Sequence, residues 1–144
     1  MLVQPTFMIL SSGIIPLRKN EEQWEYLLLR CFKYWDFPKG HGEKDESPLV
    51  TAIREMTEET TISAMKMPWG EIFYETEMYS KGKIARYYLA QVDMDAKVEL
   101  LPNPENGITE HHEYRWVTYE EAMRLANPRI KKVVEWSRRI ISPS

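Results

Sequence analysis

The sequence predicts a single α/β domain spanning residues 1–144. The length of 144 residues is typical of one domain, and the hydrophobic and charged contents of 43% and 28% are close to those of globular proteins. Segments of strand composition alternate along the chain with segments whose apolar residues follow helical spacing. The sequence has no internal repeat and no low-complexity segment, so neither a repeat protein nor wholesale disorder is expected.

The N-terminal part of the chain predicts a β-hairpin. Residues 6–17 are mostly apolar and β-permissive, and residues 24–32 also have strand composition. The polar residues 19–22 between them are typical of a turn. Gly13, inside the first strand, predicts a bulge or a close approach of another segment.

A loop and a helix are expected next. Residues 34–42 contain a proline and two glycines, which end regular structure and predict a loop of exposed backbone groups. Ser47 and Pro48 form a helix-start signature, since serine caps a free amide and proline suits the first helical position. The helix is expected to continue to about Thr60 and to bury one apolar face made of Leu49, Ala52, Ile53 and Met56.

The second half of the chain predicts further strands followed by two helices. Residues 71–79 and 84–92 have strand composition and flank a plausible hairpin turn. After a longer loop, residues 113–118 predict a short strand. Thr118 resembles a helix cap, and the last helix is expected to begin near Pro128.

Charge and cysteine content exclude several classes of function. The formal net charge of -3, from 22 acidic and 19 basic residues, provides no broad basic surface for duplex nucleic acid or an acidic membrane. No apolar run reaches the roughly 20 residues that span a bilayer, and residues 1–10 lack the basic start of a secretory signal. The lone cysteine, Cys31, cannot form an intrachain disulfide and fits a core position in a reducing cytoplasm.

Three glutamates on the predicted helix carry the main chemical signal. Glu55, Glu58 and Glu59 stand at i, i+3 and i+4, so their carboxylates share one helical face. Such clustering destabilises an isolated helix by a few tenths of a kcal/mol per pair, and a bound cation would reverse that effect. Hard divalent ions prefer oxygen ligands of this kind.

Two further residues extend this cluster. Glu46, at the junction of loop and helix, adds a fourth acid, and Arg54 is placed to orient a carboxylate through its bidentate guanidinium. Taken without their spacing, acidic helix faces are more often solvated surface than metal sites. The spacing of the whole stretch favours the metal site.

The stretch GHGEKDESPLVTAIREMTEETTI, from Gly40 to Ile62, resembles the Nudix box. The match comprises these two residues, Glu46, and the run REMTEE at residues 54–59. One position departs from the pattern, because Thr61 stands where the family has a glycine that helps the chain leave the helix. A threonine there need not touch the metal ligands, so we expect altered local geometry rather than loss of activity.

This resemblance implies a Nudix-like α/β/α sandwich, in which a mixed β-sheet lies between helices and a loop–helix–loop motif binds Mg²⁺ or Mn²⁺. It implies that the metal ligands are Glu55, Glu58, Glu59 and the carbonyl oxygen of Lys39, with Glu55 alternatively orienting the attacking water. The catalytic group it implies comprises Glu55, Glu59, Arg54 and Glu46. Bound ions of this kind neutralise phosphate charge and lower the pKa of water.

A second resemblance covers most of the chain. The segments WDFPKGH, residues 35–41, and EHHEYRW, residues 110–116, are similar to segments of asymmetric diadenosine tetraphosphate hydrolases. Physical chemistry supplies roles for residues in and near these segments: lysines grip a polyphosphate, tyrosines stack on a purine, and histidines bond phosphate. The candidate substrate-binding residues are Lys39, His41, Lys83, Tyr87, His111 and Tyr114. A single tyrosine on a strand is nevertheless more often a core residue than a base platform.

The expected partner is therefore a small-molecule nucleoside polyphosphate, cleaved asymmetrically to a nucleoside triphosphate and a monophosphate. Removal of pyrophosphate from RNA 5′ ends or from a nucleoside triphosphate is an alternative that uses the same metal site. A catalytically silent nucleotide-binding module is a second alternative, but it has no need for so much repulsive charge in one place. Glu110 or Glu113 is a candidate for a further acid from a loop, and the sequence leaves monomer and homodimer open.

Overall fold

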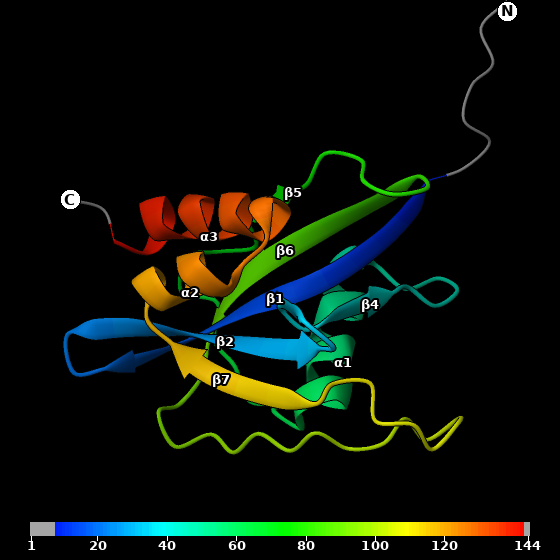
Figure 1. The fold of residues 1–144 in the computed structure, drawn as a ribbon, viewed down its shortest axis with the longest axis horizontal. Coiled ribbons are helices and arrows are strands. Elements are labelled where there is room, and N and C mark those ends of the chain that lie inside the picture. The colour runs from blue at the N-terminus through cyan, green and yellow to red at the C-terminus, as the bar shows by residue number, and fades with distance from the viewer. Residues whose placement is uncertain (1–7, 143–144) are drawn as a thin grey trace, which may run out of the picture.

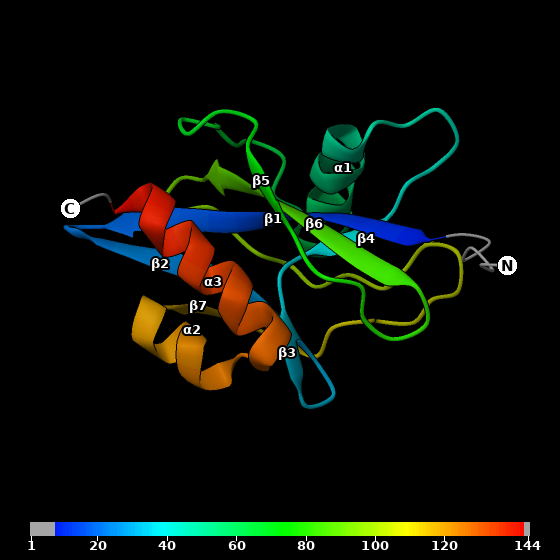
Figure 2. The same ribbon diagram turned by 90° about the horizontal axis from the view of Figure 1, so that it is seen from above.

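The computed structural model describes residues 8–142 and has a mixed, seven-stranded sheet between two helical layers (Figures 1 and 2). The helix α1 (Pro48–Thr60) covers one face, and α2 (Tyr119–Leu125) with α3 (Pro128–Ile141) covers the other. The predicted α/β/α sandwich is therefore confirmed. Residues 1–7 lie outside the described part, including Thr6 and Phe7 of the first predicted strand and most of the segment considered for a secretory signal.

The predicted N-terminal hairpin is present. The strands β1 (Ile9–Asn20) and β2 (Gln23–Cys31) are antiparallel, with Leu17 opposite Tyr26. On its other side β1 runs parallel to β6 (Lys83–Gln91), and this pairing makes the sheet mixed. The strand β1 thus joins the two halves of the chain.

The prediction of a loop at residues 34–42 is wrong, because this segment holds two short strands. The strand β3 (Tyr34–Asp36) pairs with β2, and β4 (Lys39–His41) pairs with β1. Proline cannot donate a ladder hydrogen bond, and the chain bends at Pro38 between the two strands, where it leaves β2 and begins to pair with β1.

Gly13 makes this crossing possible. A Cβ atom at Gly13 would overlap the carbonyl oxygen of Pro38, which accepts a 3.1 Å hydrogen bond from the Ile14 amide. The close approach predicted at this glycine is therefore confirmed. The hydrogen bond between the Ile14 amide and the Pro38 carbonyl oxygen holds the start of β4 against β1.

The helix α1 begins and ends as predicted. The Ser47 hydroxyl accepts a hydrogen bond from the Val50 amide at 3.3 Å, and Pro48 occupies the first turn. At the C-terminal end Thr61 has φ 67°, in the left-handed region that glycine adopts more readily. The chain therefore leaves the helix in the usual left-handed conformation, but with a threonine at the position where glycine is less strained.

The hairpin in the second half is shorter than predicted. The strand β5 covers only Phe73–Glu75 of the predicted residues 71–79. At Thr76 the side-chain hydroxyl accepts from the Ala85 amide at 3.0 Å, so a side chain replaces part of the backbone ladder. The last strand, β7 (Glu113–Val117), pairs with β2 as a short strand close to the predicted bounds.

The core has two layers because strand side chains alternate between the faces of the sheet. Ile14, Leu27 and Leu29 are fully buried and pack with Ala52 and Met56 of α1. The next residues along the strands face the other layer, which contains Ile15, Leu28, Leu89, Ala122, Ile130 and Val133. Full burial of each large side chain contributes roughly 1.5–3 kcal/mol. The α1 layer thereby fixes the acidic helix on the sheet.

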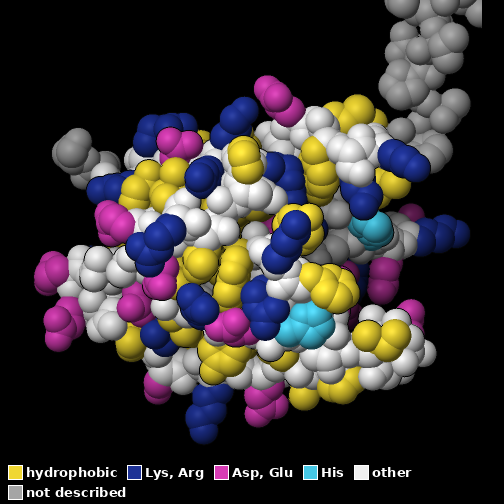
Figure 3. Space-filling view, viewed as in Figure 1, with side chains coloured by type: hydrophobic (Ala, Val, Ile, Leu, Met, Phe, Trp, Pro, Cys, Tyr) yellow, Lys and Arg dark blue, Asp and Glu magenta, His cyan; other side chains and the backbone are white. Residues whose placement is uncertain are grey.

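Two further observations concern surface charge and helix length. On the face seen in Figure 3, basic and acidic side chains are interspersed rather than gathered into a continuous basic area. Within residues 8–142, no helix is long and apolar enough to cross a membrane.

Candidate active site

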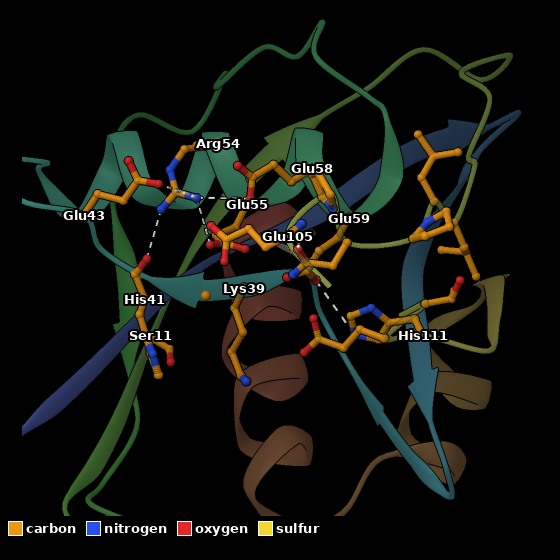
Figure 4. Close-up of a pocket in the computed structure, with 18 residues that line it drawn as sticks. Ser11, Lys39, His41, Glu43, Arg54, Glu55, Glu58, Glu59, Glu105 and His111 are labelled. Carbon is orange, nitrogen blue, oxygen red and sulfur yellow. Dashed lines mark hydrogen bonds and ion pairs between the residues drawn. The ribbon is translucent and has the colours of Figure 1, made fainter. Parts of the chain in front are cut away.

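A cavity of about 440 Å³ opens beside the acidic face of α1 (Figure 4). Its walls come from β4, the loop after it and α1, from Ser11 of β1, and from residues between 100 and 111 of the long loop before β7. Its charged and imidazole-bearing lining residues are Lys39, His41, Glu43, Arg54, Glu55, Glu58, Glu59, Glu105, Glu110 and His111. Six carboxylates therefore face two permanent cations.

The three predicted glutamates all line this cavity but differ in exposure. The side chain of Glu59 is 10% exposed and that of Glu55 is 15% exposed, whereas Glu58 is 53% exposed. Burial, followed by the charges of Glu55 and Glu110, raises the pKa of Glu59 well above its ordinary value. The surroundings of Glu59 therefore disfavour the ionised form of this carboxyl group.

Glu59 also has an unsatisfied atom. Its Oε1 is buried and has no hydrogen-bond partner among the described residues. The nearest imidazole nitrogen, Nε2 of His111, is 3.8 Å away, too far for a hydrogen bond. Burial lowers the pKa of His111, so this imidazole is mostly neutral at pH 7 and does not neutralise the carboxylate.

Glu55 lies directly against the backbone of β4. A Cβ atom at Gly40 would overlap its carboxyl group, so only glycine leaves this space free. The absence of a side chain at Gly40, the first residue of the motif, is therefore a steric requirement. It lets the helix bring its carboxylate onto the strand.

Arg54 organises the rim of the cavity, as its predicted orienting role requires. Its Nε and NH2 donate to the two oxygens of Glu46 at 2.7 and 2.9 Å, which is a bidentate pair. Its NH1 donates single bonds to Glu55 at 3.0 Å and Glu58 at 3.1 Å. Its NH2 also reaches the carbonyl oxygen of His41 at 2.9 Å. One guanidinium thus ties the helix, the loop before it and β4 together.

Glu46 does not line the cavity. Beyond Arg54, its Oε1 accepts from the Glu43 amide at 2.9 Å and the Thr51 hydroxyl at 2.7 Å. The Arg54 hydrogen bonds, with those from Glu43 and Thr51, lower the pKa of Glu46 to about 2. The fourth predicted acid is thus occupied as an anchor for Arg54, and its oxygens are not directed at the other carboxylates.

Lys39 and His41 both line the cavity, but they differ in burial and in their contacts. The Lys39 Nζ lies 3.6 Å from Asp36 Oδ2. Burial lowers the pKa of Lys39, but the charges of Asp36, Tyr79 and Glu59 outweigh it and the net shift is upward. The side chain of His41 is exposed. Of the two, Lys39 is held by Asp36, whereas His41 is open to solvent.

Three predicted substrate-binding residues are not brought to this cavity. Lys83, at the start of β6, and Tyr114, on β7, do not line it. Tyr87 is completely buried, its ring packs edge-on against Phe37, and its hydroxyl donates to Asp36 at 2.8 Å. The expectation that Tyr87 stacks on a base is therefore wrong, because neither face of its ring is open; the commoner core reading of a strand tyrosine holds.

Sequence reasoning missed two residues of this region. Asp36 and Arg129 form a partly buried ion pair of 3.5 Å, and Arg129 also donates to the Tyr87 hydroxyl at 3.2 Å. Asp36 lies inside the segment WDFPKGH but was given no role there, and no motif marked Arg129 at the start of α3. Of the two loop acids considered, Glu110 lines the cavity, whereas Glu113 is paired with Arg30 and Arg115.

The residues present fit a hard divalent cation. Within residues 8–142 no group of three acids, histidines or cysteines is already arranged as a closed metal cage. Mg²⁺ does not need one, because it usually takes one or two carboxylates and completes its shell with water and substrate phosphate. The unpartnered Oε1 of Glu59, among carboxylates that repel one another, is the kind of ligand such an ion would satisfy.

The chain is similar to known proteins over most of its length. The NUDIX domain family matches residues 9–137. The chain is 39% identical over 125 residues to the asymmetrical bis(5'-nucleosyl)-tetraphosphatase of Mus musculus, covering 83% of this chain and 80% of that protein. It is 38% identical over 117 residues to the Sus scrofa protein of the same name, with coverages of 76% and 75%. The crystal structure of a C. elegans Ap4A hydrolase binary complex shares the fold, with TM-score 0.75 and 24% identity over 95% of this chain and 100% of that one.

Proposed function

We propose that this chain, which belongs to the NUDIX domain family, hydrolyses a pyrophosphate linkage in a nucleoside polyphosphate with the help of a divalent cation. The observation that carries the proposal is the buried, unpartnered carboxylate oxygen of Glu59 in a cavity rich in acids. A protein that only bound an anionic nucleotide would gain nothing from this arrangement, because the acids repel the ligand as well as one another.

The proposed ligands of Mg²⁺ or Mn²⁺ are the carboxylates of Glu55, Glu58 and Glu59, with the carbonyl oxygen of Lys39. The ion, when bound, supplies charge neutralisation for the phosphates and a more acidic water at neutral pH. Family members generally use divalent ions, and the all-oxygen ligand set favours Mg²⁺ or Mn²⁺ over softer metals.

The remaining residues position these groups. Arg54 holds Glu55 and Glu58 through NH1, and Glu46 fixes Arg54 in turn. We assign the Lys39 ammonium to the polyphosphate and His41 and His111 to its phosphate oxygens, since all three line the cavity. Catalysis of this kind depends on position and electrostatics rather than on a covalent intermediate.

The proposed substrate is a dinucleoside tetraphosphate, cut asymmetrically to a nucleoside triphosphate and a monophosphate. The support is the identity of 38–39% to asymmetrical bis(5'-nucleosyl)-tetraphosphatases over about three quarters or more of both chains. The segment WDFPKGH contributes Lys39, Gly40 and His41 to the cavity wall, so the motif that carries the likeness also lines the site.

The deciding experiment compares the wild-type protein with Glu59→Gln. With Mg²⁺ and diadenosine tetraphosphate, we expect Glu59→Gln to lower kcat by about a thousandfold or more. Hydrolysis in ¹⁸O-labelled water identifies the phosphorus attacked, and parallel reactions with triphosphorylated RNA and a nucleoside triphosphate test the alternative substrates. Glu135→Gln, an exposed acid of α3 that does not line the cavity, is the control and should retain full activity.

The same variant has an expected effect on stability. Because the folded-state pKa of Glu59 is raised, the ionised carboxylate destabilises the fold at neutral pH, and this cost disappears in acid below its ordinary pKa. We therefore expect Glu59→Gln to melt at a higher temperature than wild type at pH 7 in the presence of a chelator. Added Mg²⁺ should raise the melting temperature of wild type but not of the variant. Full residual activity in Glu59→Gln would refute the proposal.

A further inference from the structure

Asp36, on β3, contacts residues of β4, β6 and α3. Its Oδ1 accepts two short hydrogen bonds, from the Phe37 amide at 2.7 Å and from the Tyr87 hydroxyl at 2.8 Å. Because Tyr87 is completely buried in the sheet, these bonds fix one edge of the carboxylate. The position of the second oxygen, Oδ2, is then set as well.

The second oxygen faces two cations that belong to different cavities. Lys39 Nζ is 3.6 Å away and Arg129 NH2 is 3.5 Å away. Lys39 lines the acidic cavity, whereas Arg129 lines a second cavity of about 230 Å³ together with Tyr79 and Lys132. A single carboxylate thus separates the two cations and neutralises part of their mutual repulsion.

The Lys39 ammonium has other anions within its electrostatic reach. The charge of Lys39 lowers the pKa of Glu59, and the charge of Glu59 raises the pKa of Lys39 less than that of Asp36 does. In Figure 4 the Lys39 side chain nevertheless points away from Glu55 and Glu59. Lysine is a point charge on a flexible stem, so its direction is decided by the anion that holds it.

We propose that Asp36 is a positioning residue that holds the Lys39 ammonium off the carboxylate of Glu59 and so keeps the acidic cavity open to a divalent cation. Without the charge of Asp36, the repulsion from Arg129 is no longer screened and the acids of the cavity become the strongest attraction left for Lys39. The ammonium would then occupy the unpartnered oxygen of Glu59 and compete with the metal. This inference rests on the proposed metal site but concerns a residue outside it.

The test measures metal binding without substrate in wild type, Asp36→Asn, Lys39→Met and the double variant. Asparagine keeps an oxygen for Phe37 and Tyr87 but removes the charge that faces Lys39. Binding of Mn²⁺ is followed by electron paramagnetic resonance at a temperature below all melting transitions, and the Mg²⁺-dependent shift in melting temperature is the second readout. We expect Asp36→Asn to weaken metal binding about tenfold or more, because the relocated ammonium competes with the cation for the same carboxylate.

The double variant separates positioning from structural damage. If the weakened binding comes from Lys39, removing the ammonium in Asp36→Asn/Lys39→Met should restore nearly wild-type affinity. Glu25→Gln is the matched control, because Glu25 is 16% exposed and paired with Arg18, much as Asp36 is 19% exposed and paired with Lys39. It removes one partly buried ion pair away from both cavities and should leave metal affinity unchanged.

Two results would overturn the inference while leaving the metal site intact: wild-type affinity in Asp36→Asn, or an unrestored defect in the double variant. If wild type itself bound neither Mn²⁺ nor Mg²⁺, the proposed metal site would fail and this inference with it. The two failures are therefore distinguished by the wild-type titration alone.

Discussion

Arg54 holds Glu46 through a pair of hydrogen bonds of 2.7 and 2.9 Å, while it reaches Glu55 and Glu58 through a single nitrogen. Two-point contact fixes the plane of the guanidinium, so Glu46 decides where Arg54 sits and Arg54 then decides where the other two carboxylates sit. Glu46, which the sequence suggests as a fourth acid of the cluster, therefore serves to position Arg54.

Glu46 should make the stability of the fold depend on pH. Because the folded-state pKa of Glu46 is lowered to about 2, its contribution is fully present above the ordinary value of 4.5 and is lost as pH falls towards 2. We expect Glu46→Gln to melt below wild type at pH 7, with the gap closing in acid. Melting curves between these pH values check this, and a gap that stays constant down to pH 2 would contradict it.

Gly40→Ala should damage the site without unfolding the protein. The added methyl group needs the space of the Glu55 carboxyl group, which must move off β4. Displacement of a reacting group by about 1 Å can cost around a hundredfold in rate, so we expect a loss of that size in kcat/KM. Steady-state kinetics and a melting curve on the same sample give both numbers.

Gly42→Ala is the matched control for this substitution. Its Cβ would lie 3.1 Å from the Thr51 hydroxyl oxygen and 4.0 Å from Glu46, a tight contact that a small shift relieves. We expect kcat/KM within about threefold of wild type, since displacement by a few tenths of an ångström costs far less than 1 Å. Equal losses in both variants would mean that backbone flexibility, rather than the place of Glu55, explains the effect of Gly40→Ala.

Thr61→Gly should stabilise the fold. Thr61 has φ 67°, where a side chain costs about 1–2 kcal/mol, and glycine removes this cost. Part of the gain, roughly 0.5–1 kcal/mol, is lost because glycine is freer in the unfolded chain. We expect a net increase of about 0.5–1 kcal/mol in the free energy of unfolding, measured by urea denaturation. Activity should stay near wild type, and a decrease in stability would show that the Thr61 hydroxyl, which lies near the carbonyl oxygens of Thr60 and Lys97, matters more than the strain.

Much of the fold was predictable because local chemistry decides it. Ser47 and Pro48 set the start of α1 to the residue, and the apolar spacing correctly placed Ala52 and Met56 in the core. The same spacing put Glu55 and Glu59 on one wall of the cavity. Caps and periodicity act within a few residues, so a sequence carries them directly.

The parts that were missed depend on distant partners. The strands at Tyr34–Asp36 and Lys39–His41 exist only because β2 and β1 supply ladders on either side of Pro38. The sequence makes Tyr87 a candidate base platform, but whether a strand tyrosine faces water or core is decided by what packs against it. Asp36 meets Arg129 across most of the chain, and no local pattern records such a pairing.

The parallel alignment of β1 with β6 also bears on how the protein comes into being. Parallel strands need a long connection, and here that connection contains β2, β4 and the whole of α1. The entropy of closing so long a loop delays the pairing in folding, and residues 100–111, which complete the cavity wall, follow β6 in the chain. A nascent polypeptide that has emerged from the ribosome only as far as the acids of the motif therefore still lacks the part of the cavity wall that residues 100–111 supply.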